Sequence, residues 1–179
     1  MINIDFFKLQ AKNFLKDFET KHYNEDEDVY EYSPRFFSDI DDIIFNFEID
    51  EGKPFTLMNA QHVIARLAGF YKWTELIKAT EPALELGKLL FENRLPYLEK
   101  VPIIVNDESM IVEDWKFFLT ENNLQNCDDE TKLDIFKNHF LKQDEILKKI
   151  KKEKTVLNFT NNVKAQDMLV KIMKKKCKC

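Results

Sequence analysis

The chain has 179 residues, of which 44% are apolar and 33% are charged, a balance that excludes wholesale disorder and allows one domain with a sizeable core. No apolar run approaches the roughly 18 residues of a membrane span, and the polar Asn3 and Asp5 stand where a signal region would begin, so we expect a cytoplasmic protein without a membrane partner. The net charge of −5 is uneven, because residues 142–178 hold twelve lysines and four acids whereas residues 1–141 hold 15 basic and 28 acidic side chains.

The composition predicts an all-α protein. There are only three glycines and five prolines, and residues that favour helices outnumber Val and Thr. We expect a bundle of about six or seven helices with at most one short extended segment. The phenylalanines recur at helical spacing and predict a core rather than a ligand cage. We divide the chain into a helical module, residues 1–80, and a helical C-terminal half, residues 81–179, that ends in a lysine-rich tail.

The first elements are two helices joined by a connector. Apolar residues spaced by three and four predict a helix over residues 4–18. Residues 21–28 are polar and acidic and predict a solvated loop. A second apolar stripe over residues 36–47 predicts a helix with acids near its start and on its outer face, where the helix dipole favours early carboxylates. These acids include Asp39, Asp41 and Asp42.

The next unit has clear start and stop signals. Thr56 stands at the N-cap position of a helix over residues 57–67, and Gly69 follows as its C′ residue. Phe70 is expected to fold back on the last turn, and Trp73 begins the next apolar face. We place this Gly-Phe-x-x-Trp corner in the core. His62 lies off the apolar stripe and could face a groove beside Arg66. The favoured interpretation is a surface or boundary residue that makes an ordinary hydrogen bond.

The second half predicts further helices. Pro82 can open a helix that ends before Pro96, and residues 101–105 could be extended. Apolar spacing predicts one helix from residue 111 and a long one, to residue 150, after the capping acids Asp128 and Asp129. Asn161 could cap a last helix.

Five short motifs follow one another between residues 34 and 76: Pro34-Arg35, Ala60-Gln61, Ile64-Ala65-Arg66, Gly69-Phe70, and Trp73 with Leu76. This series resembles a helical module at the N-terminus of bacterial proteins grouped with the glyoxalase superfamily. The resemblance covers about residues 5–79 and implies a bacterial source. It does not imply glyoxalase activity, because metal-dependent lyases of that class need paired His and Glu ligands, and no such set follows.

The sequence carries no catalytic or cofactor motif. The histidines, His22, His62 and His139, lie on separate segments and form no i, i+4 pair. The cysteines, Cys127, Cys177 and Cys179, are odd in number, which argues against a disulfide framework; a soft-metal site built on them is the less favoured reading. Three glycines could hardly build a phosphate loop. We therefore expect no cofactor or metal and favour a protein that is not an enzyme.

Three functional hypotheses remain open. The leading one is a non-catalytic protein-binding or regulatory module with an unidentified protein partner. The second is nucleic-acid binding through clustered lysines at the C-terminal pole, which would contact phosphates. In the third, the acidic N-terminal part inhibits a basic nucleic-acid-binding protein by imitating phosphate. The candidate residues of the lysine pole are Lys148, Lys149, Lys151, Lys152, Lys174, Lys175 and Lys176.

Overall fold

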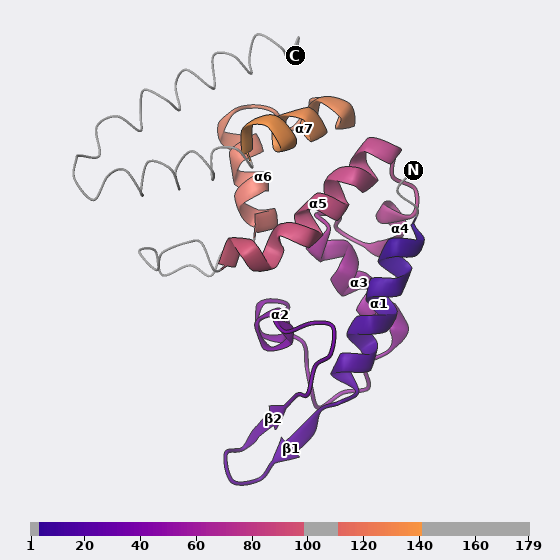
Figure 1. Ribbon diagram of the computed structural model, residues 1–179, viewed down its shortest axis with the longest axis vertical. Helices are drawn as coiled ribbons and strands as arrows, with labels where there is room; N and C mark the ends of the chain where they lie inside the picture. The colour runs from indigo at the N-terminus through magenta and orange to yellow at the C-terminus, as the bar shows by residue number, and fades with distance from the viewer. Residues whose placement is uncertain (1–3, 99–110, 141–179) are drawn as a thin grey trace, which may run out of the picture. The chain divides into compact units, whose positions relative to one another are not determined.

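A computed structural model describes residues 4–98 and 111–140 of the chain, which divides into two compact units, Met1–Ile103 and Ile104–Cys179 (Figure 1). The described residues of both units are mostly helical, which confirms the coarse fold class, although the first unit also contains a two-stranded sheet. The division lies beyond α5, whereas the sequence placed it near residue 80. The first unit holds α1 (Asp5–Phe18), β1 (His22–Asn24), β2 (Val29–Glu31), α2 (Ile40–Asn46), α3 (Leu57–Leu67), α4 (Trp73–Leu76) and α5 (Glu81–Leu98). The second holds α6 (Ile111–Glu121), α7 (Asp129–Ile135) and a π-helical segment, η1 (Phe136–Phe140).

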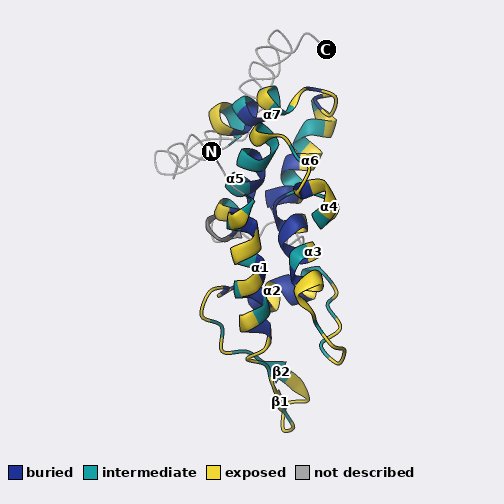
Figure 2. Cartoon of the chain, turned by 90° about the vertical axis from the view of Figure 1, so that its right-hand side faces the viewer, coloured by how far each residue is buried: buried dark blue, intermediate teal, exposed yellow. Residues whose placement is uncertain are grey.

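The core of the first unit forms where α1 packs against α3 (Figure 2). Phe7, Ala11 and Phe14 of α1 are fully buried, as their spacing by three and four requires of one helix face. Phe18 extends this stripe and stacks on Phe55, with the two ring centroids 4.2 Å apart. The predicted phenylalanine core is therefore present, although Phe45 remains 73% exposed.

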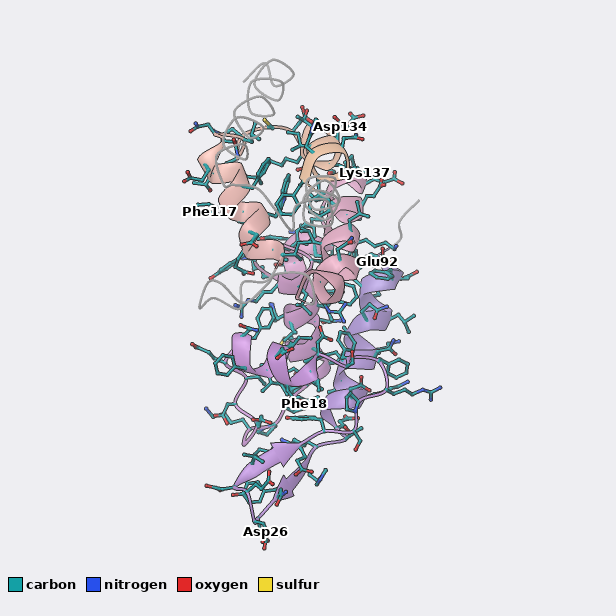
Figure 3. The ribbon with its side chains drawn as sticks, turned by 60° about the vertical axis from the view of Figure 1, so that its left-hand side comes forward. Phe18, Asp26, Glu92, Phe117, Asp134 and Lys137 are labelled. Atoms are coloured by element: carbon teal, nitrogen blue, oxygen red, sulfur yellow. The ribbon has the colours of Figure 1, made fainter. Side chains whose placement is uncertain are left out.

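A β-hairpin occupies residues 22–31, so the prediction of a loop over residues 21–28 was wrong. β1 and β2 pair antiparallel, and Tyr23 lies opposite Tyr30. Two three-residue strands were missed because their side chains are largely polar, while Asp28 takes the left-handed conformation, φ 57°, that closes the acidic turn. Figure 3 shows Asp26 at the tip of the hairpin, away from the core around Phe18.

The end of α3 confirms the predicted glycine stop. Gly69 has φ 86°, its amide donates to Arg66, and the amide of Phe70 donates to Ala65. These two bonds make a Schellman motif, which satisfies carbonyl groups at the helix end. Phe70 and Trp73 are nevertheless half-buried rather than fully in the core.

The end of α5 differs from the prediction, and the start of α7 agrees with it. α5 continues past Pro96 to Leu98, so its predicted end was wrong; a proline in the last turn removes one amide donor, but its fixed φ is compatible with a helix. Asp128 caps α7 as predicted, accepting a bond from the amide of Thr131 at 2.7 Å. The predicted extended segment, residues 101–105, and the helix after Asn161 lie outside the described residues.

The second unit is built around aromatic rings. Trp115 of α6 contacts Phe136 and Phe140 of η1, with centroids 5.2 and 5.3 Å apart. Such edge-to-face contacts stabilise a small core beyond the area that they bury. Within residues 4–98 and 111–140, no helix combines the length and the apolar character needed to cross a membrane.

Candidate functional site

The structure places some of the site residues predicted from the sequence, and the others lie outside the described residues. The lysine pole and the two terminal cysteines lie outside the described residues. Asp39 was expected on the outer face of its helix, but it is buried because it pairs with Arg94 of α5; that expectation was wrong. Asp41 and Asp42 are exposed in the first turn of α2, as expected.

The segment from residue 17 to residue 51 is strongly acidic. It contains thirteen carboxylates and only two basic side chains, Lys21 and Arg35. The hairpin, α2 and the start of the next loop all come from this segment. A surface of this composition attracts cations and repels phosphate.

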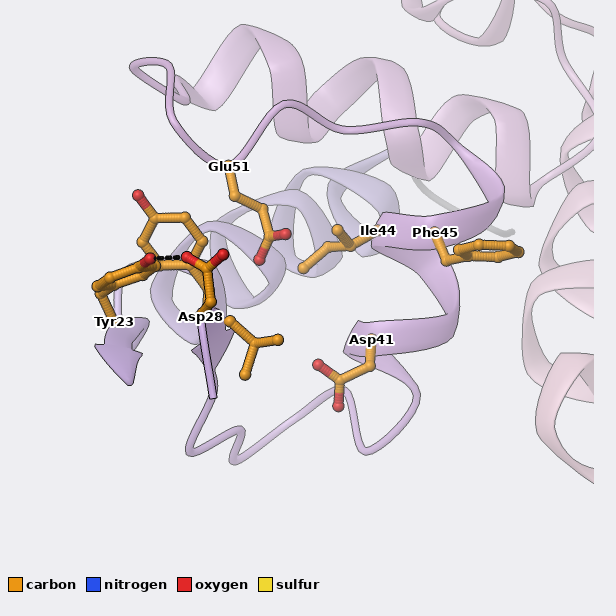
Figure 4. Close-up of a pocket in the computed structure, with 8 residues that line it drawn as sticks. Tyr23, Asp28, Asp41, Ile44, Phe45 and Glu51 are labelled. Atoms are coloured by element: carbon orange, nitrogen blue, oxygen red, sulfur yellow. Dashed lines mark hydrogen bonds between the residues drawn. The ribbon is translucent and has the colours of Figure 1, made fainter. Parts of the chain in front are cut away.

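A pocket of about 380 Å³ lies between the hairpin, α2 and the loop that follows α2 (Figure 4). We call it the acidic pocket. Its walls carry the carboxylates of Asp28, Asp41 and Glu51, the rings of Tyr23 and Tyr30, and the apolar residues Val29, Ile44 and Phe45. In Figure 4, Ile44 and Glu51 point into the pocket, whereas the ring of Phe45 points away from it.

Two tyrosine hydroxyls hold carboxylates of this pocket. Tyr23 donates to Asp28, and Tyr32 donates to Oε1 of Glu51 at 2.6 Å. The bond to Asp28 raises the pKa of Tyr23, and burial together with the bond to Glu51 raises the pKa of Tyr32. The two phenols therefore stay protonated and keep donating to these carboxylates, because ionising a phenol would place a second anion beside the first.

Lys21 borders the acidic pocket without lining it. Its Nζ donates to the backbone carbonyl of Glu51 and lies 5.0 Å from the ring centroid of Tyr30. Lys21 also lies 4.9 Å from the ring centroid of Phe18. The aromatic surface beside the pocket thus already holds an ammonium group through cation–π contact.

A second pocket, of about 300 Å³, lies between the loop after α2 and the outer face of α3. It brings together His62 and Arg66, which the sequence placed on one helix face. We call it the donor pocket. Its apolar walls are Phe47, Ile49, Pro54, Phe55 and Val63, and its polar lining is Asp50, Lys53, Asn59, His62 and Arg66.

Sequence reasoning missed the acidic pocket as a unit. Asp28, Asp41 and Glu51 come from a turn, a helix and a loop, so no spacing along the chain links them. No local pattern marks these residues either, because the strands that carry Tyr23 and Tyr30 have only three residues each. Among the described residues, no group of three or more His, Cys, Asp or Glu side chains is arranged to hold a metal ion.

The chain was compared with protein-family models, with curated proteins and with solved structures, and none of them matches it.

Proposed function

We propose that this protein is a non-catalytic binding module whose acidic pocket receives a basic side chain of a protein partner. The observation that carries the proposal is the convergence of Asp28, Asp41 and Glu51 on one concave, tyrosine-lined surface. Basic nucleic-acid-binding proteins are the partner class that this chemistry fits, since their arginines and lysines normally meet phosphates.

The pocket suits a cation for two physical reasons. Three carboxylates that share a concave surface focus a negative potential, which raises the local concentration of cations. The ring of Tyr23 adds quadrupole attraction for an ammonium or guanidinium group, as the ring of Tyr30 already does for Lys21. Tyr23 and Tyr32 each bind one carboxylate, which orients these acids before a ligand arrives.

The first experiment titrates the full chain against a fluorescein-labelled peptide that contains two arginines. A peptide with neutral citrulline in place of each arginine serves as the ligand control. We expect the combined Asp28→Asn, Asp41→Asn and Glu51→Gln variant to bind the arginine peptide at least about tenfold more weakly.

The matched control variant also loses three negative charges, but from the hairpin turn: Glu25→Gln, Asp26→Asn and Glu27→Gln. None of these residues lines the pocket. The proposal predicts less than about a twofold loss for this variant, because these exposed side chains lie outside the pocket lining and their charges are screened by salt. Equal losses in the two variants, or equal binding of the citrulline peptide, would contradict it.

The positive charge of residues 142–178 favours a second candidate, nucleic-acid binding by the lysine pole. Retention on DNA or RNA should be abolished by replacing Lys174, Lys175 and Lys176 with glutamate. Unchanged retention would reject this candidate. A pull-down with the tagged full chain, with and without nuclease, separates the two: a stoichiometric partner that survives nuclease supports the protein-binding proposal.

A further inference from the structure

We infer that the donor pocket binds a carboxylate carried on an apolar body. This pocket is separate in its lining from the acidic pocket and takes a ligand of opposite charge. The inference therefore does not depend on the proposed function. It rests on four polar side chains, Lys53, Asn59, His62 and Arg66, and on the apolar residues that line the same pocket.

Arg66 is the main hydrogen-bond donor of the donor pocket. Its guanidinium carbon lies over the ring of Phe47, 4.1 Å from the ring centroid, which is a cation–π contact. Within residues 4–98 and 111–140, Arg66 makes no side-chain hydrogen bond and no ion pair. This is notable in a unit so rich in carboxylates. The five N–H donors of an arginine match the two oxygens of a carboxylate in a fork.

Asn59 contributes a donor whose direction is fixed by the helix cap. Its Oδ1 accepts bonds from the amide and the hydroxyl of Thr56, at 2.8 and 2.5 Å. This capping box requires the oxygen of Asn59 to face Thr56. The Nδ2 group is therefore the part of the side chain left to donate to a ligand. His62 follows on the same helix, one turn before Arg66.

The one carboxylate in the lining is already occupied. Oδ2 of Asp50 pairs with Lys53 at 2.8 Å, and Oδ1 accepts the amide of Gly52 at 3.0 Å. Both bonds hold the pKa of Asp50 below its ordinary value, so it keeps its charge and its partners. Two of the polar groups left over in the pocket, the guanidinium of Arg66 and Nδ2 of Asn59, can only donate hydrogen bonds, and they call for an acceptor ligand.

The size and the walls of the pocket narrow the ligand class. A volume of about 300 Å³ is at the small end of ligand sites. Five of the ten lining residues are apolar, and two of them, Phe47 and Phe55, are aromatic. A strongly hydrated dianion such as phosphate gains nothing from such walls, whereas the ring of an aromatic carboxylate would be buried against them.

The test is a titration of the ¹⁵N-labelled full chain with benzoate, followed by NMR. Neutral benzamide and inorganic phosphate are titrated in parallel. Benzoate should shift the amide signals of Phe47, Asn59 and Val63. The substitution Arg66→Gln should lower the affinity for benzoate at least about fivefold. Arg66→Lys should give an intermediate affinity, because it keeps the charge but loses the planar fork.

Arg35→Gln is the matched control, since its guanidinium also lies over an exposed aromatic ring, that of Phe36 at 5.4 Å, outside the pocket. It should leave benzoate binding unchanged. The inference is overturned if Arg66→Gln binds benzoate as well as the unmodified chain does. It is equally overturned if benzamide or phosphate binds the same residues as strongly as benzoate. Because Arg66 is exposed, these variants should retain the circular dichroism of the parent protein.

Discussion

Arg94 of α5 holds Asp39, at the N-cap of α2, through two hydrogen bonds: Nε to Oδ2 at 2.8 Å and Nη2 to Oδ1 at 3.2 Å. Both side chains are buried, and the guanidinium also lies 4.2 Å from the ring centroid of Phe91. The pair therefore fixes the start of α2, and with it Asp41 of the acidic pocket, to the helical core.

Replacing Arg94 with methionine should destabilise the protein by about 3 kcal/mol or more, because it leaves a buried carboxylate without its partner. Chemical denaturation of the full chain measures this loss. Combining Arg94→Met with Asp39→Leu should restore part of the stability, since no unpaired charge remains. A loss equal to the sum of the two single losses would show that the pair is not coupled.

The buried carboxylate of Asp17 organises the loop before α2. It accepts the backbone amides of Arg35, Phe36 and Phe37 at 2.9, 2.7 and 2.7 Å. Asp17→Ala should cost about 3 kcal/mol of unfolding free energy, because three amides lose a charged acceptor. The exposed Glu19→Ala is the control and should change stability by less than about 0.5 kcal/mol. Similar effects of the two substitutions in urea unfolding would contradict this account.

Two glycines should resist substitution for different reasons. Gly69 has φ 86°, so Gly69→Ala should cost about 1–2 kcal/mol of backbone strain. A Cβ on Gly87 would lie 3.0 Å from the carbonyl oxygen of Ala68 and 2.8 Å from the ring of Phe70. Gly87→Ala should therefore cost about 1–3 kcal/mol through overpacking. Replacing Phe70 with leucine should relieve part of the loss in Gly87→Ala, because the contact with the carbonyl oxygen of Ala68 remains, and should relieve none of the loss in Gly69→Ala. Thermal melts of the two double variants test this difference.

Sequence reasoning predicted the features that depend on neighbours in the chain. The stripe of Phe7, Ala11 and Phe14, the Thr56 cap and the Gly69 stop each involve residues within one or two helical turns. His62 and Arg66 share a pocket for the same reason, since residues four apart lie on one helix face. These local relations fix helices and faces before any tertiary contact is known.

The missed features depend on contacts between distant segments. Asp39 looked like a solvated dipole partner because Arg94, which buries it, is 55 residues away. The hairpin was missed because each strand has only three residues, too few for alternation to exceed chance. Asp28 and Glu51 meet only because that hairpin folds back toward the loop after α2.

Glu31 should show a depressed pKa in the folded protein. Asn24 donates to its Oε1 at 2.6 Å and His22 to its Oε2 at 2.9 Å, and these bonds lower the pKa of Glu31 below 4.5. The stability that these two bonds give the folded protein is fully present at pH values above the pKa of Glu31 in the unfolded chain. It is lost as the pH falls through the lower pKa of Glu31 in the folded protein. A ¹³C titration of the carboxyl group should show the pKa rising toward 4.5 in Asn24→Ala. No change in that variant would rule out this hydrogen bond as the main cause.

Tyr32 should make the protein less stable at alkaline pH. Burial and the hydrogen bond to Glu51 raise its pKa above 10.0 in the folded state. Between the unfolded and folded values, unfolding releases a proton, so the free energy of unfolding falls by at most about 1.4 kcal/mol per pH unit. The stability that protonated Tyr32 gives the folded protein is fully present below pH 10. It is lost as the pH rises from 10 through the higher pKa of Tyr32 in the folded protein.

Tyr32→Phe removes this titration, and urea unfolding at pH 9, 10 and 11 should show a shallower loss of stability than in the unmodified chain. Below pH 10 the same variant should be less stable by about 1 kcal/mol, because the hydrogen bond to Glu51 is gone. Tyr71→Phe is the control, since it removes a hydroxyl from a side chain that is 82% exposed. The difference between the Tyr32 and Tyr71 variants separates the effect of the Tyr32 hydroxyl from other changes at alkaline pH. If both variants lose stability with pH at the same rate, the bond between Tyr32 and Glu51 does not form in solution.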